Sequence, residues 1–171
     1  MSSRTITSLT IFFFGASLAT NALSEQEANV NTAQSQAKAH TRTRAKATIN
    51  VTSSEAKPYD ETVRPALMEL HINEKFTGDI DGESTVRALQ VQNGDKSARM
   101  ISMQRFNGKL RGRPGTFVLQ GQEIVENGKI TATWFVVPGS GTGGLSGLRG
   151  EGGFAGAFGK GSEGTLDYWF E

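Results

Sequence analysis

From Ala47 to the end of the chain, apolar and polar residues alternate along several short runs. In one of these runs, Met68, Leu70, Ile72 and Phe76 share one face of an extended chain. Successive side chains of a β-strand point to opposite faces, so this period is typical of strands with one buried face. No apolar stripe in the sequence keeps a helical period over three turns. The alternation therefore restricts this part of the chain to an all-β fold.

Several segments of this kind follow one another, and turn-forming residues separate most of them. They cover residues 48–52, 68–76, 83–91, 98–106, 116–120, 129–137, 148–158 and 166–170. The dipeptide Asn-Gly, which favours the tight turns of β-hairpins, begins at Asn93, Asn107 and Asn127. Short strands joined by tight turns predict an antiparallel meander. At most one helical turn is expected, near residues 59–64.

Closure of the meander would solve the problem of its two exposed edge strands. An open sheet leaves unpaired backbone groups on its first and last strands, and a barrel removes both edges. Twelve glycines lie between Gly139 and Gly164, and glycine in strands marks sharp coiling or close backbone approach. We therefore expect a small closed antiparallel barrel of about eight strands, filled by side chains or holding one small ligand. A β-sandwich is the alternative fold.

The N-terminus has the three-part layout of a secretory signal. Arg4 supplies a positive charge, residues 9–19 form an apolar run, and Ala22 and Ser24 are small residues spaced as in a cleavage site. An eleven-residue run is too short to cross about 30 Å of bilayer hydrocarbon as a helix. We expect residues 1–24 to be a cleaved signal peptide. The mature protein is then expected to be periplasmic or secreted, with no membrane attachment.

Residues 25–46 predict a disordered spacer ahead of a barrel domain at residues 47–171. The spacer contains one large aliphatic residue, Val30, and no aromatic residue. Such a segment buries too little apolar surface to offset the entropy lost on ordering. Its end is basic, and we interpret this cluster as a solvated run, with contact to an anionic surface as the alternative. The cluster comprises Lys38, His40, Arg42, Arg44 and Lys46.

Composition argues against several classes of function. The net charge is +1, so nothing points to a nucleic-acid partner. The chain has no cysteine, which excludes disulfides, thiolate metal sites and a cysteine nucleophile. The two histidines, His40 and His71, lie far apart in the sequence. A metal centre usually takes two or three imidazoles, so no metal site is expected.

The stretch from Gly139 to Gly144 matches the string Gly-x-Gly-x-x-Gly. A dinucleotide-binding site needs a helix directly after these glycines, so that the helix N-terminus faces the pyrophosphate. The residues that follow, 145–153, form helices poorly because four of them are glycines. We interpret the stretch as a wide turn whose glycines adopt positive φ, and no cofactor is expected.

Five motifs occur in a characteristic order: residues 76–84 (FTGDIDGES), 112–120 (GRPGTFVLQ), 134–143 (WFVVPGSGTG), 148–154 (LRGEGGF) and 165–171 (TLDYWFE). With these motifs, residues 47–171 resemble the bacterial family known as domain of unknown function 3224. The resemblance implies a barrel similar to that of allene oxide cyclase and related in shape to the calycins. It implies no established activity. Members of the family often carry a histidine just after the Val-Leu-Gln strand, where this chain has Gly121 and Gln122.

Charged side chains within the strands are the first candidates for ligand contacts. Arg149 and Glu151 share one face of their strand, as do Glu83 and Arg87. One interpretation is an ion-pair network across the barrel interior. The other is a polar anchor for a carboxylate or carbonyl of a ligand, because arginine offers a bidentate fork. Gln104 completes this set of expected ligand-binding residues.

Other side chains are further candidates, although the alternation alone leaves open which face points inward. Gln120, Tyr168 and Trp134 are candidates for the lining, and Phe135 must point opposite to Trp134. Glu69 and His71 share a strand face, where a glutamate could orient an imidazole for acid–base chemistry. The alternative for that pair, on residues 69 and 71, is an exposed polar face. No spacing indicates a Ser-His-Asp triad.

Three hypotheses for function remain open at this point. The first is a binding module that holds a small, mostly apolar molecule in the barrel. The second is a cofactor-free cyclase or isomerase in which a buried carboxylate such as Glu83 or Glu151 steers charge development. The third is a structural role in a homo-oligomer, joined by an outer apolar stripe that contains Trp169 or Phe170.

Overall fold

The computed structural model describes residues 40–94, 96–157 and 160–171. The expected signal peptide and most of the expected spacer lie outside the described residues. In the described part of the chain, no helix has the length and apolarity needed to span a membrane.

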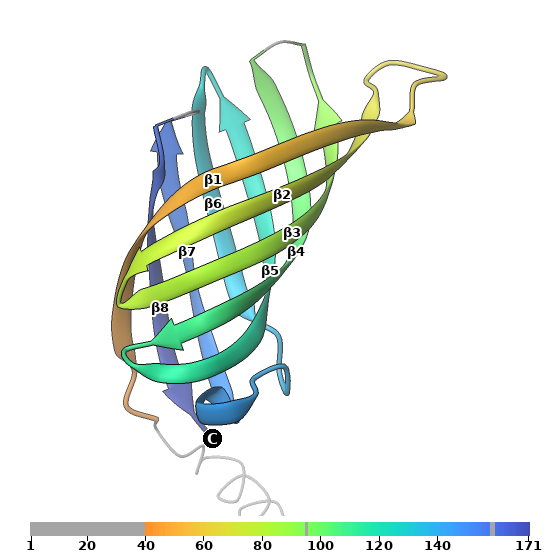
Figure 1. The fold of residues 1–171 in the computed structure, drawn as a ribbon. Helices are drawn as coiled ribbons and strands as arrows, with labels where there is room; N and C mark the ends of the chain where they lie inside the picture. Colours follow the sequence, from red (N-terminus) through yellow and green to blue (C-terminus); the bar gives the residue numbers. More distant parts are fainter. Residues whose placement is uncertain (1–39, 95, 158–159) are drawn as a thin grey trace, which may run out of the picture. The chain divides into compact units, whose positions relative to one another are not determined.

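Eight antiparallel strands form a closed barrel (Figure 1). The strands are β1 (Thr43–Asp60), β2 (Leu67–Gly78), β3 (Ile80–Gln92), β4 (Ser97–Leu110), β5 (Arg113–Glu126), β6 (Lys129–Val136), β7 (Leu148–Ala157) and β8 (Ser162–Phe170). Each strand pairs with the next in sequence, and β8 pairs with β1 to close the barrel. The expected all-β barrel is confirmed, and the sandwich alternative is wrong. Residues 59–64 form no helical turn.

Some of the hairpin turns lie where the sequence predicts them, and one predicted turn is absent from its expected position. Asn127 and Gly128 both adopt positive φ, of 52° and 77°, as the tight turn between β5 and β6 requires. Asn107 and Gly108 instead lie inside β4, which turns only at Arg111 and Gly112. Gly108 pairs with Gly82 on β3, and a Cβ on Gly108 would lie 2.6 Å from the Cα of Gly82. Glycine is therefore needed here for close approach of two strands, and the expected turn at Asn107 is wrong.

The first strand begins at Thr43, earlier than the domain start expected at Ala47. The segment from Thr43 to Lys46 pairs with β8, so it belongs to the barrel and the expected spacer ends too late. Arg44 donates hydrogen bonds of 2.7 and 2.6 Å to the two carboxylate oxygens of Asp167. Arg42 forms an ion pair with Glu151. Both arginine side chains remain more than half exposed, so this part of the basic cluster is solvated as expected, and it is also paired with acids on the barrel surface.

The seam that closes the barrel is short. Only Thr43–Ile49 of β1 pair with β8, whereas β1 stays paired with β2 as far as Asp60. The second half of β1 thus extends across the barrel beyond the seam (Figure 1). In this half even Ser54 and Ala56, which stand opposite Ile72 and Leu70 of β2, are exposed. The barrel is less completely covered at this end, which we call the open end.

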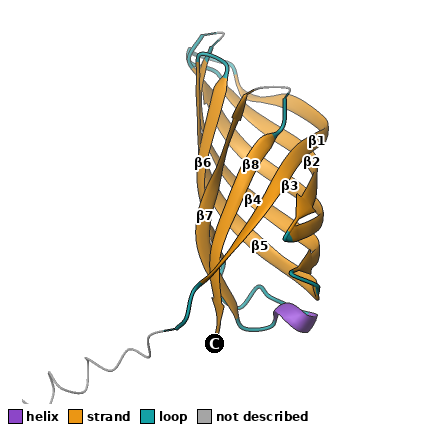
Figure 2. Ribbon diagram, turned by 90° about the vertical axis from the view of Figure 1, so that its left-hand side faces the viewer, coloured by secondary structure: helices purple, strands orange, loops and turns teal. Residues whose placement is uncertain are grey.

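The other end of the barrel is closed by the glycine-rich loop between β6 and β7. The loop contains a single 3-10 turn, Gly143–Leu145, seen at one end of the barrel in Figure 2. The side chain of Leu145 is fully buried there, and Gly139 and Gly143 adopt positive φ. The expected wide turn is confirmed. The element that follows this loop is strand β7 and not an α-helix, so the loop lacks the geometry of a dinucleotide-binding site.

The apolar core fills the half of the barrel next to this closed end. Its largest fully buried side chains are Phe76, Phe106, Phe117, Leu110, Leu145, Leu148 and Leu166. The rings of Phe76 and Phe106 meet edge to face with centroids 5.6 Å apart, and Phe106 and Phe117 are 4.8 Å apart. Burial of each such side chain stabilises the fold by about 1.5–3 kcal/mol. This packed end gives the rest of the barrel a rigid base.

Candidate functional site

Five polar side chains interrupt the apolar interior between the core and the open end. They belong to neighbouring strands β2 to β5, and four of the five are buried while Glu74 is half-buried. Along β4, for example, the inward positions run from Phe106 through polar residues to Met100 and Ala98. We call this group the interior polar cluster. Its members are Glu74, Ser84, Ser102, Gln104 and Glu123.

Three members of the cluster meet around one carboxylate. Gln104 donates a hydrogen bond of 2.5 Å from Nε2 to Oε2 of Glu74, and Ser84 donates one of 3.0 Å to the same oxygen. The amide of Gln104 also lies 2.7 Å from the Ser84 hydroxyl. Ser84 stands directly opposite Glu74 across the β2–β3 pair. The pairing of three consecutive strands thus brings donors to one oxygen of Glu74.

Glu123 has a hydrogen bond at one oxygen only. Ser102 donates to its Oε1 at 2.5 Å, whereas the buried Oε2 has no hydrogen-bond partner within the described residues. Gly121 makes room for this arrangement, because a Cβ at position 121 would lie 2.6 Å from both the Ser102 hydroxyl and Oε1 of Glu123. Position 121 therefore faces the interior polar cluster.

Both carboxyl groups are shifted toward their protonated forms. Burial raises the pKa of Glu74, and the hydrogen bonds from Ser84 and Gln104 oppose the shift. Burial also raises the pKa of Glu123, the hydrogen bond from Ser102 opposes this, and the negative charge of Glu74 raises it further. Glu74 and Glu123 are therefore close enough to influence each other electrostatically. Two acids whose pKa values are raised by burial are a common feature of functional sites.

Apolar side chains surround the cluster on the side of the open end. Leu70 and Ile72 on β2 and Met100 on β4 are half-buried, as are Ala132 and Phe154 on β6 and β7. Their inward orientation follows from the alternation along each strand, in which the neighbouring residues point outward. These side chains retain some exposure because the seam between β1 and β8 does not extend this far. The interior at this end is an apolar wall around two acids.

Four of the five side chains expected to bind a ligand point away from the interior. Glu83, Arg87 and Glu151 are exposed on the outer face. Arg149 also lies on the outer face, where it binds the carboxylate of Glu171 through two hydrogen bonds of 2.9 and 2.7 Å. The expected ion-pair network across the interior is therefore wrong, because the strand register places the opposite face inward. Gln104, the fifth residue, points inward and belongs to the interior polar cluster.

The remaining lining candidates divide between the two faces. Trp134 and Tyr168 are buried in the interior, and Trp134 and Phe135 lie on opposite faces as expected. Gln120 is exposed on the outer face. Glu69 and His71 do contact each other, with 2.7 Å between Oε1 and Nε2. This pair lies on the outer side of β2, away from the interior polar cluster.

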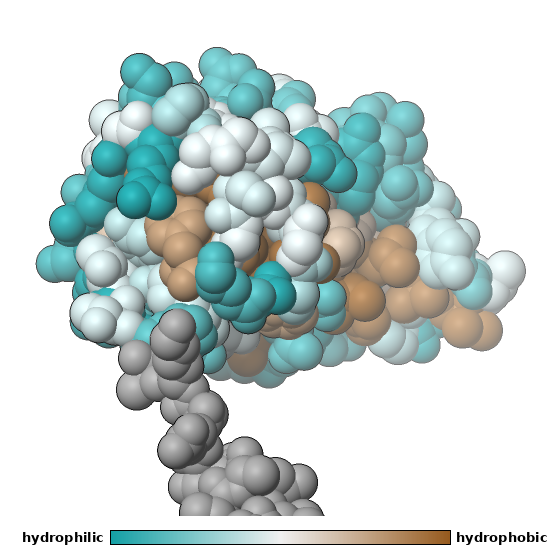
Figure 3. Space-filling view, turned by 90° about the horizontal axis from the view of Figure 1, so that it is seen from below, coloured by the Kyte–Doolittle hydropathy of each residue, from teal (hydrophilic) through white to brown (hydrophobic). Residues whose placement is uncertain are grey.

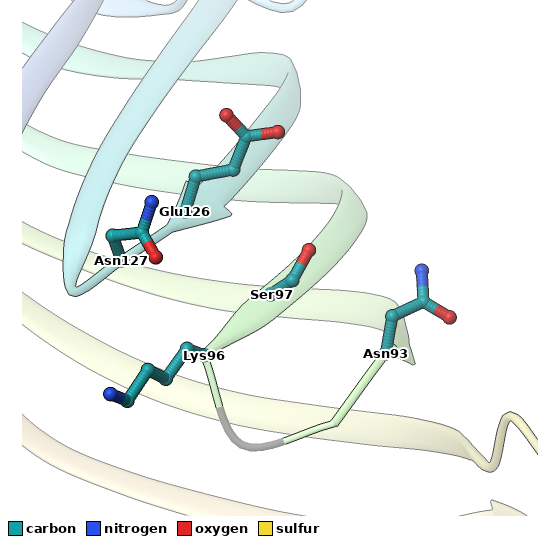
Figure 4. A pocket seen from close by; sticks show the side chains of 5 residues that line it. All are labelled: Asn93, Lys96, Ser97, Glu126 and Asn127. Atoms are coloured by element: carbon teal, nitrogen blue, oxygen red, sulfur yellow. The ribbon is translucent and has the colours of Figure 1, made fainter.

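Clefts also lie outside the interior of the barrel. One, of about 490 Å³, lies between the β3–β4 and β5–β6 turns and is lined by Asn93, Lys96, Ser97, Glu126 and Asn127 (Figure 4). Another, of about 370 Å³, crosses the outer face of β5 to β7 beside Phe135 and Glu151. The described residues that line the first cleft are polar, come from hairpin turns and include no buried acid or base. Neither burial nor charge therefore favours this cleft over the interior as a binding site.

Exposed hydrophobic side chains gather on the outer face of the barrel at β3 to β6. They are Leu89, Ile101, Met103, Ile124 and Phe135, between 41% and 59% exposed. Seen from the closed end, hydrophobic surface runs along one side of the molecule (Figure 3). Trp169 and Phe170, where an outer apolar stripe was expected, are covered by cationic groups instead. The Arg42 guanidinium stacks over Trp169 and that of Arg113 over Phe170.

The structure adds four site residues that sequence reasoning missed: Glu74, Ser84, Ser102 and Glu123. A signal for the two acids is present in the sequence. Glu74 occupies the same alternation as Ile72 and Phe76, and Glu123 lies between Leu119 and Val125 on the buried face of β5. An acid on an otherwise apolar strand face indicates a buried charge.

Among the described residues, no group of three or more histidines and acids could hold a metal ion.

Comparison with known families agrees with this architecture. The model of the family described as "protein of unknown function (DUF3224)" matches residues 45–171, which is nearly the whole barrel. The chain belongs to this family. A search of curated proteins gave no match.

A solved structure of another DUF3224 protein is also similar. It is a protein of unknown function from Shewanella oneidensis MR-1, with 25% sequence identity and a TM-score of 0.66. The similarity covers 77% of this chain and 99% of the Shewanella chain. The DUF3224 barrel is thus shared by the two proteins, and this chain has additional residues.

Proposed function

We propose that this DUF3224 protein is a binding module that holds a small, mostly apolar molecule in the open half of its barrel. The carrying observation is the buried Oε2 of Glu123, which has no hydrogen-bond partner in the described part of the chain. A buried polar atom without a partner costs about 1–3 kcal/mol. A bound molecule that reaches this atom recovers that cost.

The wall of the open half supports an apolar body for the ligand. Ile72, Met100 and Phe154 surround the acids and are only partly covered by the protein itself. Ligand sites are typically apolar pockets with a few convergent polar groups that fix orientation. The interior polar cluster supplies those groups, and the packed core beneath it holds them in place.

A pair of neighbouring substitutions tests this proposal. Ala88 is buried between Leu70 and Ser102 on the inner face, and Leu89 is exposed on the outer face. Ala88→Phe adds a ring beside the interior polar cluster, whereas Leu89→Phe adds one outside the barrel. We expect Ala88→Phe to weaken binding of a neutral naphthylamine fluorophore at least tenfold and Leu89→Phe to leave it within about twofold.

Two measurements make this experiment decisive. Circular dichroism must show that both variants keep the β-sheet signal of the unaltered protein. Native mass spectrometry of protein purified from its host should show a bound small molecule that is reduced in Ala88→Phe. Equal binding of the fluorophore by both folded variants, or an absence of binding by the unaltered protein, would exclude a site in the interior.

A second candidate function, a cofactor-free isomerase or cyclase, is favoured by the raised pKa values of Glu74 and Glu123. A carboxyl group that holds its proton near neutral pH can act as a general acid, and a neighbouring carboxylate can stabilise developing positive charge. Glu83 and Glu151, the acids expected to do so, lie on the outer face. If the protein is an enzyme, Glu123→Gln should abolish turnover of the co-purified molecule even at concentrations of it that saturate the variant.

A further inference from the structure

The open half of the barrel contains acids and no bases. Besides Glu74 and Glu123, its inward-facing side chains are hydroxyls, amides and apolar groups throughout the described part of the chain. The arginines and the lysines nearby, such as Arg87, Arg105 and Lys75, occupy the outward positions of β2 to β4 and are exposed. No positive group among the described residues therefore neutralises the two acids from within the barrel.

The hydrogen bonds in the cluster have a common direction. Ser84 and Gln104 donate to Glu74, and Ser102 donates to Glu123. All these bonds reach Oε2 of Glu74 and Oε1 of Glu123, and Oε2 of Glu123 is left buried and unpartnered among the described residues. Glu123 is only 8% exposed. The cluster therefore keeps one buried acceptor that has no donor among the described residues.

We propose that the ligand carries a positively charged nitrogen, as a protonated amine does, which is bound by Glu74 and Glu123. An ammonium group offers three donors and no acceptor, so it complements carboxylate oxygens that lack donors. It also supplies the charge that the interior lacks, and charge-assisted hydrogen bonds are about twice as strong as neutral ones. The apolar part of the ligand then lies against Ile72, Met100 and Phe154. This inference rests on the proposed function.

Burial of the acids has a direct consequence for binding. Both acids hold protons more readily than free glutamate, because burial disfavours the charged form. A cation between them favours the charged forms instead. The ligand therefore has to be able to displace protons from the site, which an amine does and an alcohol of the same length does not.

A matched series of ligands on the unaltered protein separates the alternatives. The series is n-octylamine, n-octanol and n-octanoate, each titrated near neutral pH below its micelle-forming concentration and measured by displacement of the neutral naphthylamine fluorophore. We expect the amine to bind at least tenfold more tightly than the alcohol and the alcohol more tightly than the carboxylate. The alcohol measures the contribution of the apolar chain alone.

Two variants then assign the preference to the site. Glu123→Gln should lower the affinity for octylamine at least tenfold and change that for octanol less than about threefold. Glu83→Gln removes an acid from the outer face and should change neither. If the alcohol or the carboxylate binds as tightly as the amine, the inference of a cationic ligand is overturned while the binding module stands. If none of the three binds, the proposed function itself fails.

Discussion

Ser102 on β4 and Glu123 on β5 form a hydrogen bond of 2.5 Å in the interior of the barrel, beside a glycine on β5. The glycine is Gly121, which is paired with Ser102 in the strand register. A side chain at this position would occupy the space that the hydrogen bond uses. The small residue therefore belongs to the site as much as the two polar ones do.

Gly121→Ala tests this relationship directly. The new Cβ would lie 2.6 Å from both polar atoms, so the hydrogen bond must break or the side chains must shift. We expect a loss of about 1–3 kcal/mol in the free energy of unfolding, because a buried polar group loses its partner. Chemical denaturation measures this. In a Ser102→Ala, Glu123→Ala background the same substitution should cost much less, and an equal cost in both backgrounds would contradict the relationship.

Glu123→Gln is expected to stabilise the protein more as the pH rises. The folded-state pKa of Glu123 lies above its ordinary value of 4.5. Between these two values the folded protein binds more protons than the unfolded chain, so the free energy of unfolding falls as pH increases. Glutamine does not titrate, so a glutamine at position 123 does not lower the free energy of unfolding as the pH rises. The Tm of Glu123→Gln minus that of the unaltered protein should therefore increase from about pH 4 to about pH 8.

Asp167→Asn provides a comparison of opposite sign. The hydrogen bonds from Arg44 hold the pKa of Asp167 below its ordinary value, so Asp167 contributes stability that is lost as pH falls. The Tm of Asp167→Asn should fall further below that of the unaltered protein as pH rises through the ordinary value of 3.8, and the difference should level off above about pH 5. Solvent screens this exposed pair, and the change should be small. If the Tm differences of the two variants changed with pH in the same direction, the opposite pKa shifts of Glu123 and Asp167 would be contradicted.

Trp134 and Phe135 are adjacent residues with different expected contributions to stability. Trp134 is 5% exposed, packs with Phe76 and Phe154, and donates a hydrogen bond to the backbone carbonyl of Thr165. Phe135 is 42% exposed on the outer face. Trp134→Ala should cost about 3–5 kcal/mol, and Phe135→Ala should stay within about 1 kcal/mol. Thermal and urea denaturation of the two variants checks the difference, and comparable losses would contradict the assignment of faces.

The N-terminal sequence makes a prediction about maturation. We propose that residues 1–24 direct export and are removed, which leaves a mature chain that begins at Glu25. Intact-mass spectrometry of protein recovered from outside the cytoplasm should show this mass. A substitution of a bulky residue for Ser24, such as Ser24→Trp, should block cleavage because the site requires small residues. Recovery of the full-length chain from the cytoplasm alone would contradict this prediction.

Local sequence determined the class of the fold. The alternation in β2 and the Asn127-Gly128 turn depend on interactions within a few residues, so strands and most hairpins are visible without coordinates. The short seam between β1 and β8 is not visible, because the two strands lie at opposite ends of the domain. The same is true of Asn107 and Gly108, which form a turn in isolation but lie within β4 because the coiled wall needs close contact with Gly82.

The interior polar cluster also depends partly on local sequence and partly on tertiary structure. That Glu74 shares a face with Ile72 and Phe76 follows from the sequence by counting residues. That this face points into the barrel, and that of Glu83 and Arg87 outward, depends on how each strand is paired with its neighbours. The contact of Glu74 with Gln104 spans three strands. Only closure of the barrel puts Glu74 and Glu123 in one interior, because the energy that selects register comes from burial of whole strand faces.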